Sequence, residues 1–109
     1  MEVREYIDRS GRSPFAAWSD CLNQEAAAKV ASALARIQQG NFSAAKGVGS
    51  GVFEYRIDFG PGYRIYFGRD GDRLVILLGG GTKKRQHADI LTALQRWRDY
   101  KARRRKGDS

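Results

Sequence analysis

The sequence predicts a single α+β domain in which an N-terminal strand and a helical hairpin pack on an antiparallel sheet, followed by a C-terminal helix. Three observations lead to this expectation. Side chains alternate between apolar and polar through residues 52–59 and again through 63–67, which is the period of a half-buried strand. Apolar residues recur at helical spacing between 24 and 39. A continuous apolar run over 74–78 is typical of a strand in the interior of a sheet.

The N-terminal elements follow from local signals. A short strand is expected over residues 3–8, ahead of the helical hairpin. Ser13 followed by Pro14 predicts the start of the first helix, with serine as the cap and proline at the first helical position. Asn23 predicts the cap of a second helix over residues 24–39. Its core-facing side is expected to be a stripe of apolar residues: Ala26, Val30, Ala33, Leu34 and Ile37.

The two alternating segments are expected to form a hairpin around residues 60–62, because glycine permits positive φ and proline presets a turn. We expect a three-residue loop that pairs Phe59 with Tyr63, since this register keeps the alternating apolar side chains on one face. Arg56 and Arg64 would then lie diagonally across the two strands, on the polar face.

The remaining connections carry glycine. Residues 42–51 are expected to form an irregular loop that carries Lys46, and residues 69–72 a turn before the third strand. The glycines at 79–81 allow a sharp turn or a close approach of backbone, and Thr82 is expected to cap the last helix. The buried face of that helix is predicted from its spacing: Ala88, Leu91, Leu94 and Trp97.

Charge and length indicate one basic domain with an anionic partner. A chain of 109 residues is long enough for one modest core. Its formal net charge is +8, with 20 lysines and arginines, and such a charge favours an anionic partner. Five of these residues lie in the run Lys101–Lys106. We therefore expect a folded domain over residues 1–100 and a basic tail over 101–109.

Cellular location is expected from cysteine use and from hydropathy. The single Cys21 has no internal disulfide partner, which favours a reducing compartment. Its place in a helical stretch near Trp18 predicts a buried structural thiol. No segment approaches the ~20 apolar residues of a membrane span, and the N-terminus lacks a basic-then-apolar leader. We expect a cytoplasmic protein.

The candidate site is cationic. One histidine and one distant cysteine do not make a metal site, and no cofactor is expected. Two alternatives account for paired arginines on a polar face. Either Glu54 or Asp58 neutralises them, or the rigid strands hold their forks for a phosphate. Tyr66 shares that face and is a candidate RNA contact, as is Lys46. The cationic residues of the candidate site are Arg56, Arg64, Lys83, Lys84, Arg85 and His87.

Such a group suits cleavage of RNA by its own 2′-hydroxyl group. The phosphorane-like transition state gains negative charge, which arginine and lysine placed in advance can stabilise. His87, or a lysine whose pKa neighbouring cations lower, would move the protons.

Three stretches together resemble the RelE/ParE superfamily of type II toxins, and most closely its HigB-like "addiction module killer" branch. They are G-V-F-E-Y-R-I-D-F-G-P-G-Y-R-I-Y-F, L-V-I-L-L-G-G-G-T-K-K-R-Q and the following A-D-I-x-x-A-L. The upstream W-x-x-C-L and G-N-F also match, so the resemblance covers roughly residues 1–100. It implies a RelE-like fold, a ribosome-dependent endoribonuclease that cuts mRNA in the A site, and a cognate antitoxin, usually a helix-turn-helix protein.

The resemblance also assigns residues. Arg64 matches the strand arginine that contacts the scissile phosphate, and Arg56 matches a basic position on the preceding strand. The run Lys83–Arg85 matches the basic segment after the last strand. Where some relatives place a tyrosine near the C-terminal helix, this sequence carries His87 and Ile90.

Two other functions remain open at this point. A ParE-like inhibitor of DNA gyrase would act through surface helices and would need no convergent phosphate site. A plain nucleic-acid-binding module would depend on phosphate contacts, with affinity that falls steeply as salt rises.

Overall fold

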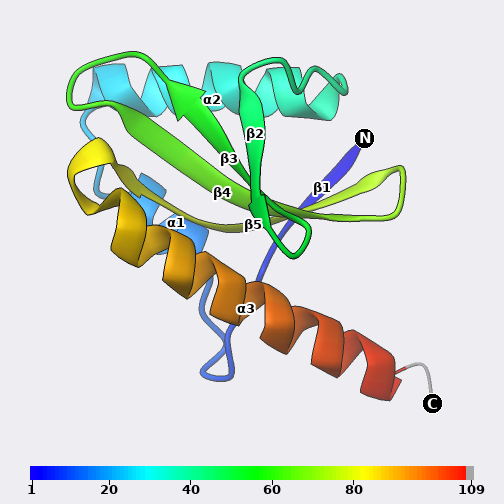
Figure 1. Ribbon diagram of the computed structural model, residues 1–109. Helices are drawn as coiled ribbons and strands as arrows, with labels where there is room; N and C mark the ends of the chain where they lie inside the picture. Colours follow the sequence, from blue (N-terminus) through cyan, green and yellow to red (C-terminus); the bar gives the residue numbers. More distant parts are fainter. Residues whose placement is uncertain (108–109) are drawn as a thin grey trace.

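The computed structural model describes residues 1–107 and confirms the predicted α+β architecture (Figure 1). These residues form a five-stranded mixed sheet in the order β1-β5-β4-β3-β2, in which β1 runs parallel to β5 and the other neighbours are antiparallel. Helix α2 covers one face of the sheet and α3 the other. The strands are β1 (Glu2–Glu5), β2 (Ala45–Gly49), β3 (Val52–Ile57), β4 (Tyr63–Asp70) and β5 (Leu74–Thr82). The helices are α1 (Pro14–Ser19), α2 (Gln24–Gln38), a 3₁₀ turn (Lys83–Arg85) and α3 (Gln86–Gly107).

Both helices of the N-terminal hairpin begin where the caps predict. The Ser13 hydroxyl accepts a hydrogen bond from the backbone N–H of Ala16 at 3.1 Å. Asn23 Oδ1 accepts one from the N–H of Ala26 at 2.9 Å. Each cap therefore satisfies a backbone donor that the first helical turn leaves without an intrahelical partner.

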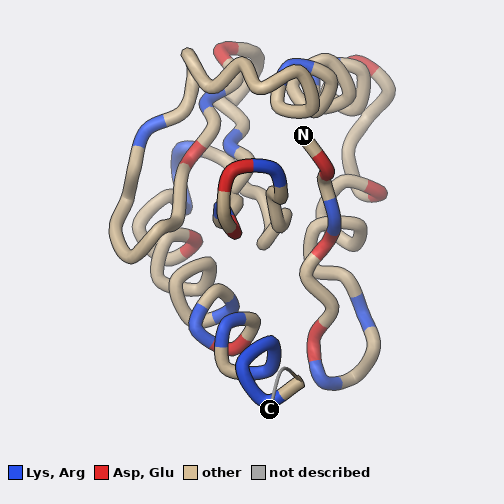
Figure 2. Tube along the Cα trace, turned by 90° about the vertical axis from the view of Figure 1, so that its right-hand side faces the viewer, with Lys and Arg blue, Asp and Glu red and all other residues tan. Residues whose placement is uncertain are grey.

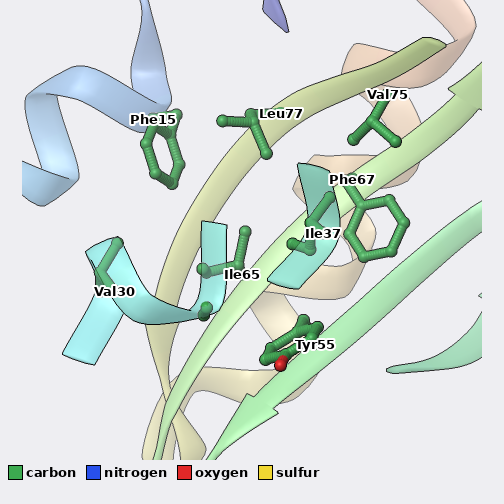
Figure 3. Packing of buried hydrophobic residues seen from close by; sticks show 9 residues of the cluster. Phe15, Val30, Ile37, Tyr55, Ile65, Phe67, Val75 and Leu77 are labelled. Atoms are coloured by element: carbon green, nitrogen blue, oxygen red, sulfur yellow. The ribbon is translucent and has the colours of Figure 1, made fainter. Parts of the chain in front are cut away.

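Two apolar layers lie on opposite faces of the sheet. Figure 3 shows the layer toward α2, where Val30 and Ile37 pack against Phe67 and Leu77 of the sheet. The second layer lies under α3 and includes Val52, Tyr66, Ile76, Ala93 and Trp97. Because α3 covers this face, Glu54 of β3 and Arg64 of β4 are enclosed as well, whereas Arg56 on the same face of β3 is exposed.

The β3–β4 register differs from the prediction by two residues. Ile57, rather than Phe59, pairs with Tyr63, so the loop spans residues 58–62. A shift of two keeps every side chain on its predicted face, which is why the pattern alone could not reveal it. Arg56 consequently lies directly opposite Arg64 instead of diagonally across from it.

Several local expectations were wrong. Residues 45–49 of the expected loop form the edge strand β2, which pairs with β3. Cys21 is exposed, because it lies in the turn after α1 ends. Within the described residues, Thr82 makes no side-chain cap hydrogen bond. In α3, Ala93 and Trp97 are the buried residues, whereas Ala88 and Leu91 are exposed, Leu91 by 51%.

The basic C-terminal segment continues α3 as far as Gly107, and polar contacts hold it against the rest of the domain. Tyr100 donates a hydrogen bond to Asp70 at 2.8 Å, and Arg104 forms an ion pair with the same carboxylate. Arg103 donates to the backbone carbonyl of Ile7 at 2.5 Å. Residues 108–109 of the predicted tail lie outside the described residues. No helix within residues 1–107 is long and apolar enough to cross a membrane.

Candidate functional site

A buried carboxylate lies at the centre of the α3 face of the sheet. The Glu54 side chain is 0% exposed. Its oxygens accept hydrogen bonds from the hydroxyl of Tyr66, at 3.1 Å, and from Nε2 of Gln86, at 3.1 and 2.9 Å. Tyr66 lies on β4 directly opposite Glu54, and Gln86 is the first residue of α3. A buried charge needs such partners, since an unpaired one costs several kcal/mol.

Arg64 is the cationic partner of this carboxylate. Its Nε lies 3.6 Å from Oε1 of Glu54, and its side chain is only 5% exposed. At that distance the pair is ionic rather than hydrogen-bonded, and within residues 1–107 the buried Nε has no hydrogen-bond partner. Nη1 donates to the backbone carbonyl of Gly62 at 3.0 Å. Of the two alternatives considered for the arginine pair, neutralisation by Glu54 therefore applies to Arg64.

The carbonyl of Gly62 joins the β3–β4 loop to the segment after β5. Besides Arg64 Nη1, it accepts a hydrogen bond from the backbone N–H of Lys83 at 2.8 Å. Gly62 has φ +80°, and a Cβ there would lie 3.2 Å from Nη1 of Arg64. Glycine at this position thus allows the loop to close over the arginine. The Arg64 guanidinium and the Lys83 backbone are thereby brought to the same carbonyl.

The other predicted cations are exposed on neighbouring segments of the chain. Arg56 is exposed and lies opposite Arg64. Lys83, Lys84 and Arg85 are all exposed on one 3₁₀ turn, and His87 is exposed in the first turn of α3 that follows. We call Arg56, Lys83, Lys84, Arg85 and His87 the cationic rim.

Lys46 and Tyr66 lie apart from the rim. Lys46 is exposed on the edge strand β2. Its cross-strand neighbour on β3 is Glu54, which precedes Arg56 by two residues. Tyr66 is 1% exposed, so its ring offers no face on which a base could stack. Burial, followed by the charge of Glu54, raises the pKa of the Tyr66 hydroxyl well above its usual range. This group is a neutral hydrogen-bond donor that supports Glu54.

Sequence reasoning missed the enclosure of Glu54 and the part played by Gln86. The alternation in β3 places Glu54 on the polar face, but only the docking of α3 buries that face. The sequence does offer one signal for Gln86: it directly follows the basic run, at the position where the last helix begins.

A second concentration of positive charge lies on the C-terminal half of α3, from Arg96 onward. Figure 2 shows lysines and arginines gathered on the last turns of α3, with few acidic residues between them. Within residues 1–107 there is no group of three or more His, Cys, Asp or Glu side chains that could hold a metal ion.

Fold and site together define a small α+β protein with a cationic rim beside a buried glutamate–arginine pair. Residues 17–98 match the family model described as Phage derived protein Gp49-like (DUF891), and the chain belongs to this family, a toxin-like family of toxin–antitoxin systems. A protein of Haemophilus influenzae (strain ATCC 51907 / DSM 11121 / KW20 / Rd), described as an uncharacterized protein, is 46% identical over 80 residues. That match covers 72% of this chain and 81% of the relative.

Proposed function

We propose that this chain is the toxin of a type II toxin–antitoxin pair, near the HigB-like branch of the RelE/ParE superfamily, and that it cleaves mRNA on the ribosome. The observation that supports this function is the meeting of Arg64 and Lys83 at the Gly62 carbonyl. Buried contacts fix Arg64 at this carbonyl, and Lys83, Lys84 and Arg85 are exposed on the turn that begins there. Three exposed cations on a turn with a fixed start suit a scissile phosphate.

In the proposed reaction the substrate supplies its own nucleophile. The 2′-hydroxyl attacks the adjacent phosphorus and the bond to the 5′ oxygen breaks, which leaves a 2′,3′-cyclic phosphate and a 5′-hydroxyl end. One proton leaves the 2′-hydroxyl and one is delivered to the 5′ oxygen. Lys83, Lys84 and Arg85 stabilise the charge that develops on the phosphate oxygens, and His87 transfers a proton. Arg64, which is buried and paired with Glu54, supports them by holding the Gly62 carbonyl that also accepts from the Lys83 N–H.

RNA binding would continue along the sheet edge from the rim. Arg56 and Lys46 are exposed on neighbouring strands and can contact phosphates on either side of the cut. Tyr66 acts in this proposal through Glu54 and not by stacking, because its ring is enclosed.

The family suggests an antitoxin as partner. We propose that a helix-turn-helix antitoxin neutralises the toxin by laying an acidic segment over Arg56 and the Lys83–Arg85 turn. Action on translating ribosomes places the protein in the cytoplasm.

The experiment that tests this function compares wild type with Lys83→Ala/Lys84→Ala/Arg85→Ala. All three residues are exposed, so the variant leaves the buried glutamate–arginine pair intact. A matched control, Arg12→Ala/Arg36→Ala/Arg73→Ala, removes the same charge from exposed positions elsewhere. A defined mRNA is incubated with purified ribosomes, and its cut ends are mapped by primer extension.

We expect discrete cuts that require ribosomes, that persist in the control and that fall at least about a hundredfold in the rim variant, since one lost transition-state donor costs roughly 10²–10³ in rate. Intact mRNA with wild-type protein would refute the nuclease. When the protein is expressed in a bacterial host, growth arrest with intact mRNA and induction of a DNA-damage response would instead favour the gyrase inhibitor.

A further inference from the structure

A polar cleft of about 250 Å³ lies on the side of α3 that faces α1. Its lining includes Trp18 from α1, Gly79 and Gly80 from β5, and Asp89 and Arg96 from α3. Strand β1 pairs with β5 only as far as Leu77. The cleft therefore occupies the place that a longer β1 would fill beside the second half of β5.

Glycines on β5 make room for the side chains of this cleft. A Cβ at Gly81 would lie 2.0 Å from Oδ2 of Asp89, and one at Gly79 would lie 2.6 Å from Nη1 of Arg96. Neither distance is possible for real atoms. The carboxylate and the guanidinium are therefore held directly against the strand backbone, and any larger residue at 79 or 81 would displace them.

The cleft adjoins residues of the proposed phosphate site. Gly81 is the cross-strand partner of Arg64 on β4. Because the Asp89 carboxylate stands where a Gly81 side chain would be, it lies about one cross-strand spacing, roughly 5 Å, from the base of the Arg64 side chain. Arg85 belongs to both regions, since it lies on the cationic rim and also lines the cleft.

Side chains of both charges line the cleft: Asp89 is acidic, and Arg85 and Arg96 are basic. Arg96 Nη1 donates to the Leu78 carbonyl at 2.8 Å, which fixes its planar guanidinium. A guanidinium carries several further N–H donors that a ligand can use. Burial raises the pKa of the Asp89 carboxyl group, although Arg85 and Arg96 act in the opposite direction. A ligand that donates two hydrogen bonds to this carboxylate would offset the cost of its burial.

We propose that the cleft binds a guanine base of the RNA, next to the phosphate at the rim. The inference rests on the proposed function and names the specificity-determining residues of that site. Guanine alone among the four bases presents two adjacent donors, N1–H and the N2 amino group, which match one carboxylate; its O6 and N7 accept from an arginine fork. Asp89 would read the donors and Arg96 the acceptors. The cleft is smaller than the roughly 300–1,000 Å³ of drug-sized pockets, as suits one heterocycle.

The first test measures binding without cleavage. The purified protein is titrated with millimolar guanosine, adenosine, cytidine or uridine 5′-monophosphate, and the backbone amide shifts are followed by NMR. We expect the guanine nucleotide to shift the amides of Gly79, Gly80 and Thr92 and the other three to shift them much less. Asp89→Asn should abolish this difference, whereas Asp72→Asn, which removes an exposed carboxylate from the β4–β5 turn, should retain it.

The second test measures base preference during cleavage. Four reporter mRNAs differ in one nucleotide beside a mapped cut. Wild type should prefer guanine by roughly 5- to 100-fold, the discrimination of a bidentate base contact, and Asp89→Asn should lose most of that preference while still cutting. Cuts without guanine preference, or an unchanged preference in Asp89→Asn, would overturn the guanine site and leave the nuclease standing. No cuts by wild type would refute the nuclease, and selective guanine-nucleotide shifts would then still support the site.

Discussion

The Glu54 carboxylate lies 3.6 Å from Nε of Arg64, and both side chains are enclosed between the sheet and the start of α3. Each member of such a pair compensates the buried charge of the other. The pair also gives a reason for the approach of Gln86, which adds the hydrogen bonds that the ion pair alone lacks.

Removal of one member should therefore cost much more than removal of both. Glu54→Ala leaves Arg64 as an uncompensated buried charge, and we expect a loss of about 3–5 kcal/mol in the free energy of unfolding, measured by urea denaturation. The double variant Glu54→Gln/Arg64→Met removes both charges and should lose less than the single variant. A loss below about 1 kcal/mol in Glu54→Ala, the average for a point mutation, would contradict this account of the pair.

Close packing of Trp97 on β4 gives a second prediction. A Cβ at Gly68 would lie 2.3 Å from the Trp97 ring, so Gly68→Ala should push α3 away from the sheet. We expect a loss of at least about 1–3 kcal/mol in the free energy of unfolding. Gly47→Ala is the control, because its Cβ would lie at an ordinary 3.8 Å from Phe53. Equal effects of the two substitutions would show that Trp97 does not pack as described.

Alkaline pH should weaken the attachment of the C-terminal half of α3. Burial, together with the hydrogen bond to Asp70, raises the pKa of Tyr100 from 10.0 to about 12. The hydroxyl thus loses its proton near pH 10 in the unfolded chain and only near pH 12 in the folded one. Its contribution to stability is complete below pH 10 and is lost as the pH rises toward 12.

The measurement compares wild type with Tyr100→Phe by urea denaturation at pH 8, 9, 10 and 11. The difference in stability between the two proteins should be constant up to about pH 9 and should shrink above pH 10. A difference that stays constant through pH 11 would exclude the raised pKa.

Salt dependence should report the phosphate contacts of the rim. If Lys83, Lys84 and Arg85 each contact one phosphate of a single-stranded RNA, the triple alanine variant should lower the slope of log K against log [salt] by about 2, because each contact contributes roughly 0.7. Fluorescence anisotropy with a labelled oligonucleotide measures both slopes. The variant Arg12→Ala/Arg36→Ala/Arg73→Ala should keep the wild-type slope, and a similar decrease in this variant would mean that binding follows net charge alone.

Prediction from sequence succeeded where neighbouring residues determine structure. Ser13 and Asn23 carry their own capping chemistry, so both helix starts were predictable. The β3–β4 register was not, because a shift of two residues preserves the alternation of faces. Lys46 was predicted to lie in a loop because the glycines around it are not typical of a strand. Strand β2 forms by pairing with β3, which the local sequence does not indicate.

The candidate site also contains features that the local sequence indicates and features that depend on distant segments. The cations were visible as residue types, but the contacts of Arg64 and of the Lys83 backbone with the Gly62 carbonyl were not predicted. The burial of Glu54 and Tyr66 depends on α3, which docks from more than 20 residues away in sequence. Alternation distinguishes two faces of a strand, but it does not say which face a distant helix will cover.

Strand β1 pairs in parallel with β5, so the first strand of the chain needs a partner that begins only at Leu74. Helix α3, which encloses Glu54 and Arg64, follows β5 in the chain. During synthesis the sheet is therefore incomplete until β5 has emerged, and the buried pair beside the cationic rim is enclosed only after α3 has followed. A chain that stops before Trp97 lacks that anchor of the second apolar layer, so an interrupted product should neither fold nor assemble its rim.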